Sequence, residues 1–265
     1  MRRFVYDRLV GKYDLTQWCS SIRDQGKLDS SSAHANIAMI EFLYKKRFGK
    51  YIPMSAMFSL KVAINLERRN SEPHGDIGSS PSAGVAAGRL FGAVPEEFWP
   101  YIQENFDKEP PAFCYALAQN FKSYDYLRLD YGGVSKSSLL RSIKMAIADG
   151  VLVTFGFAMY PSIDQSATDG KIPCPCQGEK IRRGHAVNAV GWDDNMKIRN
   201  LNCEEVTEGA IRIRNSWGVG WGDKGYGWLP YDYFLHGMTE HCWALYGLES
   251  YIDLEEFGLN IRSFT

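Results

Sequence analysis

The sequence predicts an α+β protein in which helices occupy the first half of the chain and strands dominate the second. In the first half, apolar residues recur at Ile37, Ile40 and Leu43, which is the spacing of a helix with one buried face. In the second half, residues 151–158 form an apolar run rich in β-forming side chains. Helices followed by strands indicate the α+β class, with the change of character near residues 121–126.

The expected helices of the first half are bounded by capping and turn residues. Residues 30–32 are serines, which are N-cap candidates for a helix over 33–44, and Gly49 lies just past its end. Further helices are expected at residues 56–66, 83–91 and 112–121. The segment 70–82 is rich in turn-forming residues, and we expect it to be a loop.

The second half is expected to contain strands around one amphipathic helix. That helix covers residues 137–149, begins among serines and ends at Gly150. Strands are expected at residues 124–129, 151–158, 186–192 and 210–214, and aromatic, glycine-rich segments typical of strands continue to Tyr251.

The charge balance argues against two classes of partner. The chain of 265 residues carries 30 Lys+Arg against 31 Asp+Glu, so its net charge of −1 offers no long-range attraction for nucleic acid or an anionic membrane. The first 13 residues lack the apolar core of a secretory signal, and no apolar stretch approaches the ~20 residues that span a bilayer. We therefore expect a cytoplasmic protein, or one delivered into a host or a virion.

The six cysteines do not form the pattern of a disulfide-stapled scaffold or of a zinc site. Cys174 and Cys176 flank a single proline, whereas paired zinc thiolates usually have two or more residues between them. Further zinc ligands for this pair would have to come from Cys203, His236, His241 and Cys242. We expect no metal site, and a reducing rather than an oxidising compartment.

Three segments carry residue types that together can perform acyl transfer. Residues 25–34 place a run of serines at a helix start, after a Gln-Gly pair. Residues 184–192 place His185 at the head of an apolar strand, and residues 215–227 begin with Asn215 in an Asn-Ser-Trp-Gly run. They supply a hydroxyl at a helix N-terminus, an imidazole and an amide that can orient the imidazole. Each residue alone would more often be structural, but their joint order favours a site.

In this order and spacing the chain resembles the papain-like (C1-type) cysteine peptidases. Their pattern is a Gln-Gly pair, a nucleophilic cysteine six residues after the glutamine, a Gly-His-Ala strand, and an Asn-Ser-Trp-Gly segment with later Gly-Trp-Gly and Gly-Tyr pairs. The resemblance covers residues 14–250. Leu28 stands where many members have a disulfide cysteine, which is similar to the prokaryotic or viral branch.

One position departs from the pattern, because Ser31 stands where the family has its nucleophilic cysteine. In the family, a thiol beside a histidine at a helix N-terminus is held as a thiolate, with a pKa of about 3–4 instead of about 8.5. A serine hydroxyl forms no such ion pair with His185 and needs a general base during attack. We expect the chain to be inactive or severely impaired as a peptidase.

The resemblance implies a role for each remaining residue of the site. His185 would carry protons, Asn215 would orient its ring, and Trp217 would shield their hydrogen bond from water. The Gln25 side chain and the N–H of Ser31 would form the oxyanion hole.

Among substrate-binding residues, Trp221 would line the leaving-group side, and Gly78 would pair its backbone with the substrate. Asp29, where the family usually has glycine, would narrow the non-primed cleft, favour a basic residue, or cap the helix. His34, His74, His236 and His241 lack a motif and are expected to be structural or exposed.

The resemblance also implies a two-lobe architecture and a peptide or protein substrate, with no cofactor. Residues 1–13 would be an extension too short for the family's propeptide, residues 14–122 a helical lobe carrying Ser31, and residues 123–265 a barrel-like, β-rich lobe carrying His185 and Asn215. Ser31 has two explanations, an introduced Cys→Ser replacement, which we favour, and natural loss that leaves a peptide-binding pseudoenzyme. An acyl-transfer or ligase variant is a further alternative.

Overall fold

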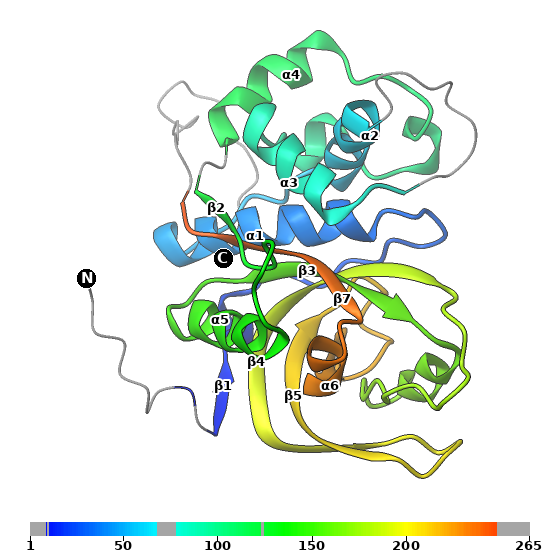
Figure 1. The fold of residues 1–265 in the computed structure, drawn as a ribbon. Helices are drawn as coiled ribbons and strands as arrows, with labels where there is room; N and C mark the ends of the chain where they lie inside the picture. The colour runs from blue at the N-terminus through cyan, green and yellow to red at the C-terminus, as the bar shows by residue number, and fades with distance from the viewer. Residues whose placement is uncertain (1–8, 10, 68–77, 123–124, 248–265) are drawn as a thin grey trace.

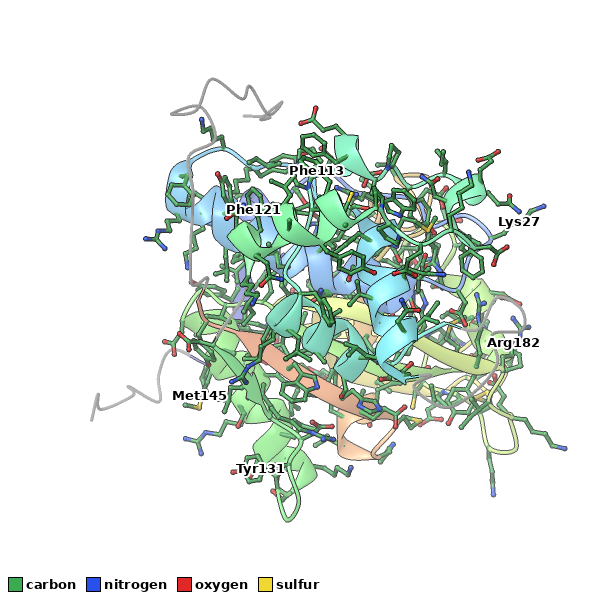
Figure 2. All side chains as sticks on the ribbon, turned by 90° about the horizontal axis from the view of Figure 1, so that it is seen from above. Lys27, Phe113, Phe121, Tyr131, Met145 and Arg182 are labelled. Atoms are coloured by element: carbon green, nitrogen blue, oxygen red, sulfur yellow. A yellow bond between two sulfur atoms is a disulfide. The ribbon has the colours of Figure 1, made fainter. Side chains whose placement is uncertain are left out.

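A helical layer lies over a twisted antiparallel sheet in the computed structural model, which describes residues 9, 11–67, 78–122 and 125–247 (Figure 1). The α-helices are α1 (Ser31–Phe48), α2 (Ala56–Glu67), α3 (Pro81–Leu90), α4 (Ala112–Ala118), α5 (Lys136–Ala148) and α6 (Tyr231–Leu235). Short 3-10 turns are η2 (Thr16–Trp18), η3 (Glu96–Phe98), η4 (Gln103–Asn105), η5 (Gln119–Phe121) and η6 (Pro161–Ser166). Figure 2, turned to look from above, shows the helices of the first half in front of the strands.

The sheet joins strands from both ends of the described chain. Its strands are β1 (Lys12–Asp14), β2 (Tyr126–Arg128), β3 (Val153–Met159), β4 (Arg183–Arg199), β5 (Val206–Arg214), β6 (Tyr226–Pro230) and β7 (Thr239–Leu245). Their order is β2-β7-β3-β4-β5-β6, every pair is antiparallel, and β1 pairs with β4. Within the described residues this path does not close between β2 and β6. The α+β class is confirmed, and the expected barrel-like lobe is a curved open sheet.

Most elements expected from the sequence are present within a few residues of their predicted limits. The main difference concerns α1, which we expected to bury one face. It buries 13 of its 18 residues, including polar Asn36 and Glu41. The reason is its place between the other helices and the sheet (Figure 1), so that both of its sides meet protein. The strand β1 and the short helix α6 were not expected, since three and five residues carry too little periodicity. Residues 70–77 of the expected loop, and 248–251 of the expected strand region, lie outside the described residues.

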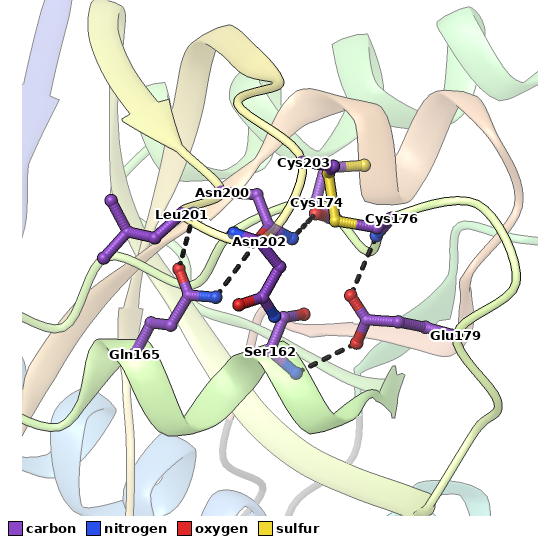
Figure 3. The surroundings of a disulfide bond; sticks show 9 residues. All are labelled: Ser162, Gln165, Cys174, Cys176, Glu179, Asn200, Leu201, Asn202 and Cys203. Carbon is purple, nitrogen blue, oxygen red and sulfur yellow. Dashed lines mark hydrogen bonds between the residues drawn. A yellow bond between two sulfur atoms is a disulfide. The ribbon is translucent and has the colours of Figure 1, made fainter.

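A disulfide joins Cys176 to Cys203, a pairing that was not expected from the sequence. The bond ties the segment before β4 to the tip of the β4–β5 hairpin (Figure 3). The Glu179 carboxylate strengthens this junction by accepting hydrogen bonds from the main-chain N–H groups of Cys176 and Ser162, at 2.9 and 3.0 Å. This pairing could not be predicted from the sequence, because the two cysteines are 27 residues apart and come together only in the fold.

We expect the disulfide to stabilise the folded chain measurably. Closing a loop of 27 residues in the unfolded chain corresponds to about 3.5 kcal/mol. Reduction should therefore lower the free energy of unfolding by about that amount, measured by urea titration with and without dithiothreitol. The double variant Cys176→Ser, Cys203→Ser is the control, and reductant should not change its stability further. Equal stability of reduced and oxidised chains would contradict the prediction.

Candidate active site

Two of the three segments singled out in the sequence, residues 25–34 and 184–192, contribute to one cleft between the helices and the sheet, and the third is joined to it by the bond between Asn215 and His185. A cavity of about 290 Å³ opens there, and Ser31, His185, Asp29 and Gly78 all line it. Among the described residues, the lining consists of Asp29, Ser31, Gly78, Ser79, Ser80, Pro81, Gly156, Phe157, Arg183, Gly184, His185, Ala186, Glu240 and His241. The helical layer contributes one wall and strands β3, β4 and β7 contribute the other.

Ser31 is the first residue of α1 and is buried at 6% exposure. Ser30 occupies the N-cap position but makes no side-chain capping bond, so the predicted serine start is confirmed while the capping bond is not. The main-chain N–H of Ala186 donates to Ser31 Oγ at 3.2 Å across the cleft. This N–H and the positive end of the 18-residue helix both favour a negative charge on the side-chain atom that follows Cβ at position 31.

His185 and Asn215 form the hydrogen-bonded pair that the sequence predicted. The distance from His185 Nε2 to Asn215 Oδ1 is 2.7 Å. Because Oδ1 only accepts, and also accepts from Ser216 N at 2.8 Å, Nε2 carries the ring proton and Nδ1 is left as an acceptor. The His185 ring lies 4.6 Å from the ring of Trp217 and 5.8 Å from that of Phe157, centroid to centroid.

The imidazole of His185 is uncharged at neutral pH. Burial lowers the pKa of His185 to about 4, the hydrogen bond with Asn215 opposes this shift, and the charge of Arg183 adds to it. A neutral ring with a free Nδ1 can accept a proton, but it provides no resting imidazolium. The site therefore holds no ion pair between residues 31 and 185.

Gln25 lies beside this pair through its contacts with Ser216. Gln25 N donates to Ser216 O at 2.8 Å, and Ser216 Oγ donates to Gln25 Oε1 at 2.7 Å. Gln25 Nε2 donates one of its two protons to Leu28 O at 2.9 Å. The amide is thus fixed in orientation, and its second Nε2 proton is the one that an oxyanion hole would use.

The substrate-binding residues predicted from the sequence divide into two groups. Asp29 and Gly78 touch across the cavity, since a Cβ on Gly78 would lie 2.8 Å from Asp29 Cγ. The tryptophans lie outside the cavity lining: Trp217 covers His185, and Trp221 packs edge-on against Trp217 at 5.2 Å. Trp217 packs on the His185 ring, which makes the hydrogen bond with Asn215. This position is consistent with Trp217 shielding that bond from water.

Comparisons with known proteins identify the family. The family described as "Papain family cysteine protease" matches residues 11–243, which is most of the chain. The chain belongs to the papain family. This papain-family chain is similar to an uncharacterised peptidase C1-like protein of Acanthamoeba polyphaga mimivirus, at 29% identity over 228 residues covering 84% of this chain and 68% of that protein. It is 26% identical to Peptidase 1 of Psoroptes ovis and spans 61% of that protein's length.

Solved structures agree with this assignment. The fold is similar to that of xylellain, a cysteine protease from Xylella fastidiosa, with a TM-score of 0.75, 26% identity, and coverage of 95% of this chain and 91% of the other. A clostridial cysteine protease shares the fold at a TM-score of 0.71 and 19% identity, over 91% of this chain and 58% of the other. Viral and bacterial relatives are thus both present, as the resemblance predicts.

Sequence reasoning missed part of the cleft of this papain-family chain. Gly156 forms part of the cavity wall between Pro81 and Glu240, where a Cβ would lie 3.5 Å from Pro81 Cγ. His241, expected to be structural or exposed, also lines the cavity and bonds Ser82 Oγ through Nδ1 at 2.7 Å. Of these two residues, only Gly156 could have been noticed in the sequence. It is a glycine inside a predicted strand, and such a glycine often marks a place where a ligand or another backbone approaches closely.

Neither a metal centre nor a membrane-spanning helix is found in the part of the chain that the structure describes. No three His, Cys, Asp or Glu side chains there are grouped to hold a metal ion. No helix there is both long and apolar enough to cross a bilayer. Two candidate zinc thiols, Cys176 and Cys203, are joined in the disulfide.

Two buried histidines should make stability depend on pH. Burial lowers the pKa of both His34 and His185 to about 4, whereas the unfolded value is about 6.5. As the pH falls below about 6.5 the unfolded chain binds protons first, so stability is lost between pH 6.5 and 4. At pH 5 the loss is about 2 kcal/mol per histidine. Urea unfolding at pH 7 and pH 5 measures it.

The control is His34→Gln, which should remove about half of this pH-dependent loss. The exposed His236, replaced by glutamine, should change nothing. A free energy of unfolding that stays level from pH 7 to pH 5 would rule out two neutral, buried imidazoles.

Proposed function

We propose that this chain is a papain-type cysteine peptidase whose nucleophile position is occupied by Ser31, so that it does not hydrolyse peptide bonds as it stands. The observation that carries the proposal is the convergence of Ser31 and His185 on one cavity, with the Ala186 N–H donating to Ser31 Oγ and Asn215 bonding His185. The substrate class that the family implies is a peptide or protein.

With a thiol at position 31, each contact of the site acquires a chemical role. The thiol gives its proton to Nδ1 of His185, and the resulting thiolate attacks the scissile carbonyl carbon, whose oxygen becomes an oxyanion beside the Gln25 amide and the N–H of residue 31. His185 then gives a proton to the leaving amine, which departs and leaves a thioester. Water attacks this acyl-enzyme, with His185 taking the water's proton, and releases the new carboxylate.

With serine at position 31, the first of these steps is the one that fails. A hydroxyl has a much higher pKa than a thiol, so the positive end of α1 and the Ala186 N–H do not ionise it. His185 would have to remove the proton during attack, and neutral Asn215 stabilises the resulting imidazolium less than a carboxylate does. The proposed machinery is therefore complete except for an ionised nucleophile.

Retention of the rest of the machinery favours an introduced Cys→Ser replacement. A long-inactive protein has no physical need to keep Gln25, His185, Asn215 and Trp217 in their hydrogen-bonded and packed arrangement. The second candidate is a natural pseudoenzyme that binds peptide or protein, and the observation in its favour is Ser31 itself.

Covalent labelling tests the proposal. An epoxysuccinyl peptide alkylates only an activated thiol, so it should add one mass increment to the Ser31→Cys variant at pH 6 and none to the chain as it stands. The four buried free cysteines, Cys19, Cys114, Cys174 and Cys242, provide the internal control, since none should react. A Ser31→Cys variant that reacts no faster than these thiols would contradict the proposal.

Asp29 is proposed to select a basic side chain on the non-primed side of the scissile bond. Its carboxyl group lies against Gly78 within the cavity that Ser31 lines, and only glycine at 78 leaves room for it. In the Ser31→Cys background, Asp29→Asn should lower the preference for arginine over norleucine substrates by about fivefold, the scale of a half-exposed ion pair. Substrate pairs that differ only at this residue measure it, and an unchanged ratio would leave Asp29 with a packing role.

A further inference from the structure

A path of hydrogen bonds, partly buried, runs behind the loop of residues 25–30 that leads into α1. It begins at His34 on α1, passes through Ser30, continues to Tyr101 between η3 and η4, and ends on the main-chain oxygen of Gln25. His34 Nδ1 is 3.1 Å from Ser30 O and 3.3 Å from Ser30 Oγ. Ser30 Oγ is 2.6 Å from Tyr101 Oη, which is 2.9 Å from Gln25 O.

The direction of each bond follows from what its atoms can donate. The carbonyl of Gln25 only accepts, so the single proton of Tyr101 Oη points to it. Ser30 then donates its hydroxyl proton toward Tyr101 Oη at 2.6 Å, which is much closer than its other acceptor, Leu28 O at 3.4 Å. The carbonyl of Ser30 also only accepts, so His34 Nδ1 carries a proton. Burial lowers the pKa of His34 to about 4, and the ring is neutral with that one proton. The whole path is therefore ordered in one direction at neutral pH.

Tyr101 is fixed from its other end by an ion-pair network. Its main-chain N–H donates to Glu96 Oε1 at 2.6 Å, and Glu96 Oε2 is 3.2 Å from Arg23. Arg23 in turn pairs with the buried Glu41 on α1 at 2.6 Å. The ring of Tyr101 also meets that of His34 edge-on, at 4.8 Å between centroids. The phenol is thus anchored independently of the loop that it contacts.

The loop is held on its opposite side by the segment that carries Asn215. Gln25 exchanges two hydrogen bonds with Ser216, through its main-chain N and its side-chain Oε1. Tyr101 therefore supplies the support on the side away from Asn215. Removing it would leave this end of the loop held only from the side of the Asn215 segment, by Ser216 and by the bridge between Asp24 and Trp217, among the contacts that the structure describes.

We propose that Tyr101 is a positioning residue: by holding the Gln25 carbonyl and the Ser30 hydroxyl, it sets the loop so that the Gln25 amide and the N–H of residue 31 converge on one substrate oxygen. This inference rests on the proposed function of the cleft. Tyr101 does not touch the cavity and acts only through the loop.

The first test needs no peptidase activity and uses the chain as it stands. Tyr101→Phe removes only the hydroxyl, and we expect amide hydrogen exchange in peptides covering residues 25–31 to rise by about tenfold. Tyr126→Phe is the matched control, because Tyr126 Oη donates to Asn36 Oδ1 on the same helix at 3.0 Å, five residues beyond the nucleophile position. Its exchange in residues 25–31 should stay within twofold of the parent.

The second test asks whether the loop position matters for chemistry. In the Ser31→Cys background, Tyr101→Phe should lower kcat by about tenfold with KM within twofold, because a displaced oxyanion donor is felt mainly in the transition state. Alkylation of the introduced thiol by iodoacetamide, which forms no oxyanion, should stay within twofold. Tyr126→Phe should leave all three quantities unchanged.

The outcomes separate this inference from the proposed function. Unchanged exchange in Tyr101→Phe, or an equal rise in Tyr126→Phe, overturns the positioning role whatever the Ser31→Cys chain does. Raised exchange with an unchanged kcat also overturns it. A Ser31→Cys chain that cleaves nothing refutes the proposed function, and the exchange result then still decides whether Tyr101 holds the loop.

Discussion

Ser31→Cys is expected to turn the chain into an active peptidase, with a gain in kcat/KM on the order of 10⁴–10⁶-fold for peptide amides, the scale of losing a catalytic nucleophile. The physical reason is the environment at the start of α1. The helix terminus and the Ala186 N–H, which donates to Ser31 Oγ at 3.2 Å, favour an anion there. A thiol can ionise in this environment, whereas a hydroxyl cannot. Fluorogenic peptide hydrolysis with purified protein measures the change.

The matched control is Ser32→Cys, which places a thiol one residue further along the same helix. Ser32 is buried and its hydroxyl bonds Ser79 rather than Ala186. We expect no hydrolysis by this variant, and a melting temperature close to that of the parent will show that it folds. Hydrolysis by both variants would mean that any thiol near the cleft is sufficient. It would contradict the claim that the nucleophile must stand at position 31.

The second large effect is expected at His185. In the Ser31→Cys background, His185→Ala should lower kcat/KM by roughly 10⁴–10⁶-fold, since a nucleophile and its base act as a unit. Asn215→Ala should cost less, because Asn215 only orients the ring through its 2.7 Å bond. In addition, the negative charge of the thiolate should raise the pKa of His185 in the Ser31→Cys variant. Hydrolysis by this variant should then fall at low pH, where the thiolate is protonated, and at high pH, where His185 loses its proton.

The control for this prediction is His236→Ala, because His236 is exposed and lies outside the cleft. Peptide binding by the chain with Ser31 should survive His185→Ala, since binding needs no proton transfer. A Ser31→Cys, His185→Ala double variant that still hydrolyses peptides at a tenth of the parent rate would contradict the assigned role.

The fold could be predicted from the sequence where the information is local. The helices α1 and α5 and the strand β3 follow from periodicity, serine-rich starts and β-forming residues. The all-round burial of α1 could not be predicted, because it depends on the sheet that packs beneath it. The disulfide was missed for the same reason, as Cys176 and Cys203 meet only when the β4–β5 hairpin folds back.

The site shows the same division between local and long-range information. Ser31, His185 and Asn215 lie in short motifs whose spacing identified them before the fold was known. Gly156, Glu240 and Tyr101 have no such motif. Gly156 and Glu240 line the cavity because β3 and β7 pair in the sheet, whereas Tyr101 lies outside the cavity, in a segment held by ion pairs, and contacts the main chain of Gln25. Motifs therefore named the candidate residues, and only the structure shows what surrounds and supports them.

The central claim is that the cleft is complete except for an ionisable nucleophile. Its most direct test exposes the chain and its Ser31→Cys variant, side by side, to one proteome-derived peptide mixture, with new peptide termini identified by mass spectrometry. We predict new termini from the Ser31→Cys variant alone, and their residues will report the specificity of the cleft. New termini from the chain with Ser31 would contradict the claim, since they would show that the hydroxyl serves as a nucleophile. Binding by both without cleavage by either would assign the chain to the peptide-binding pseudoenzymes.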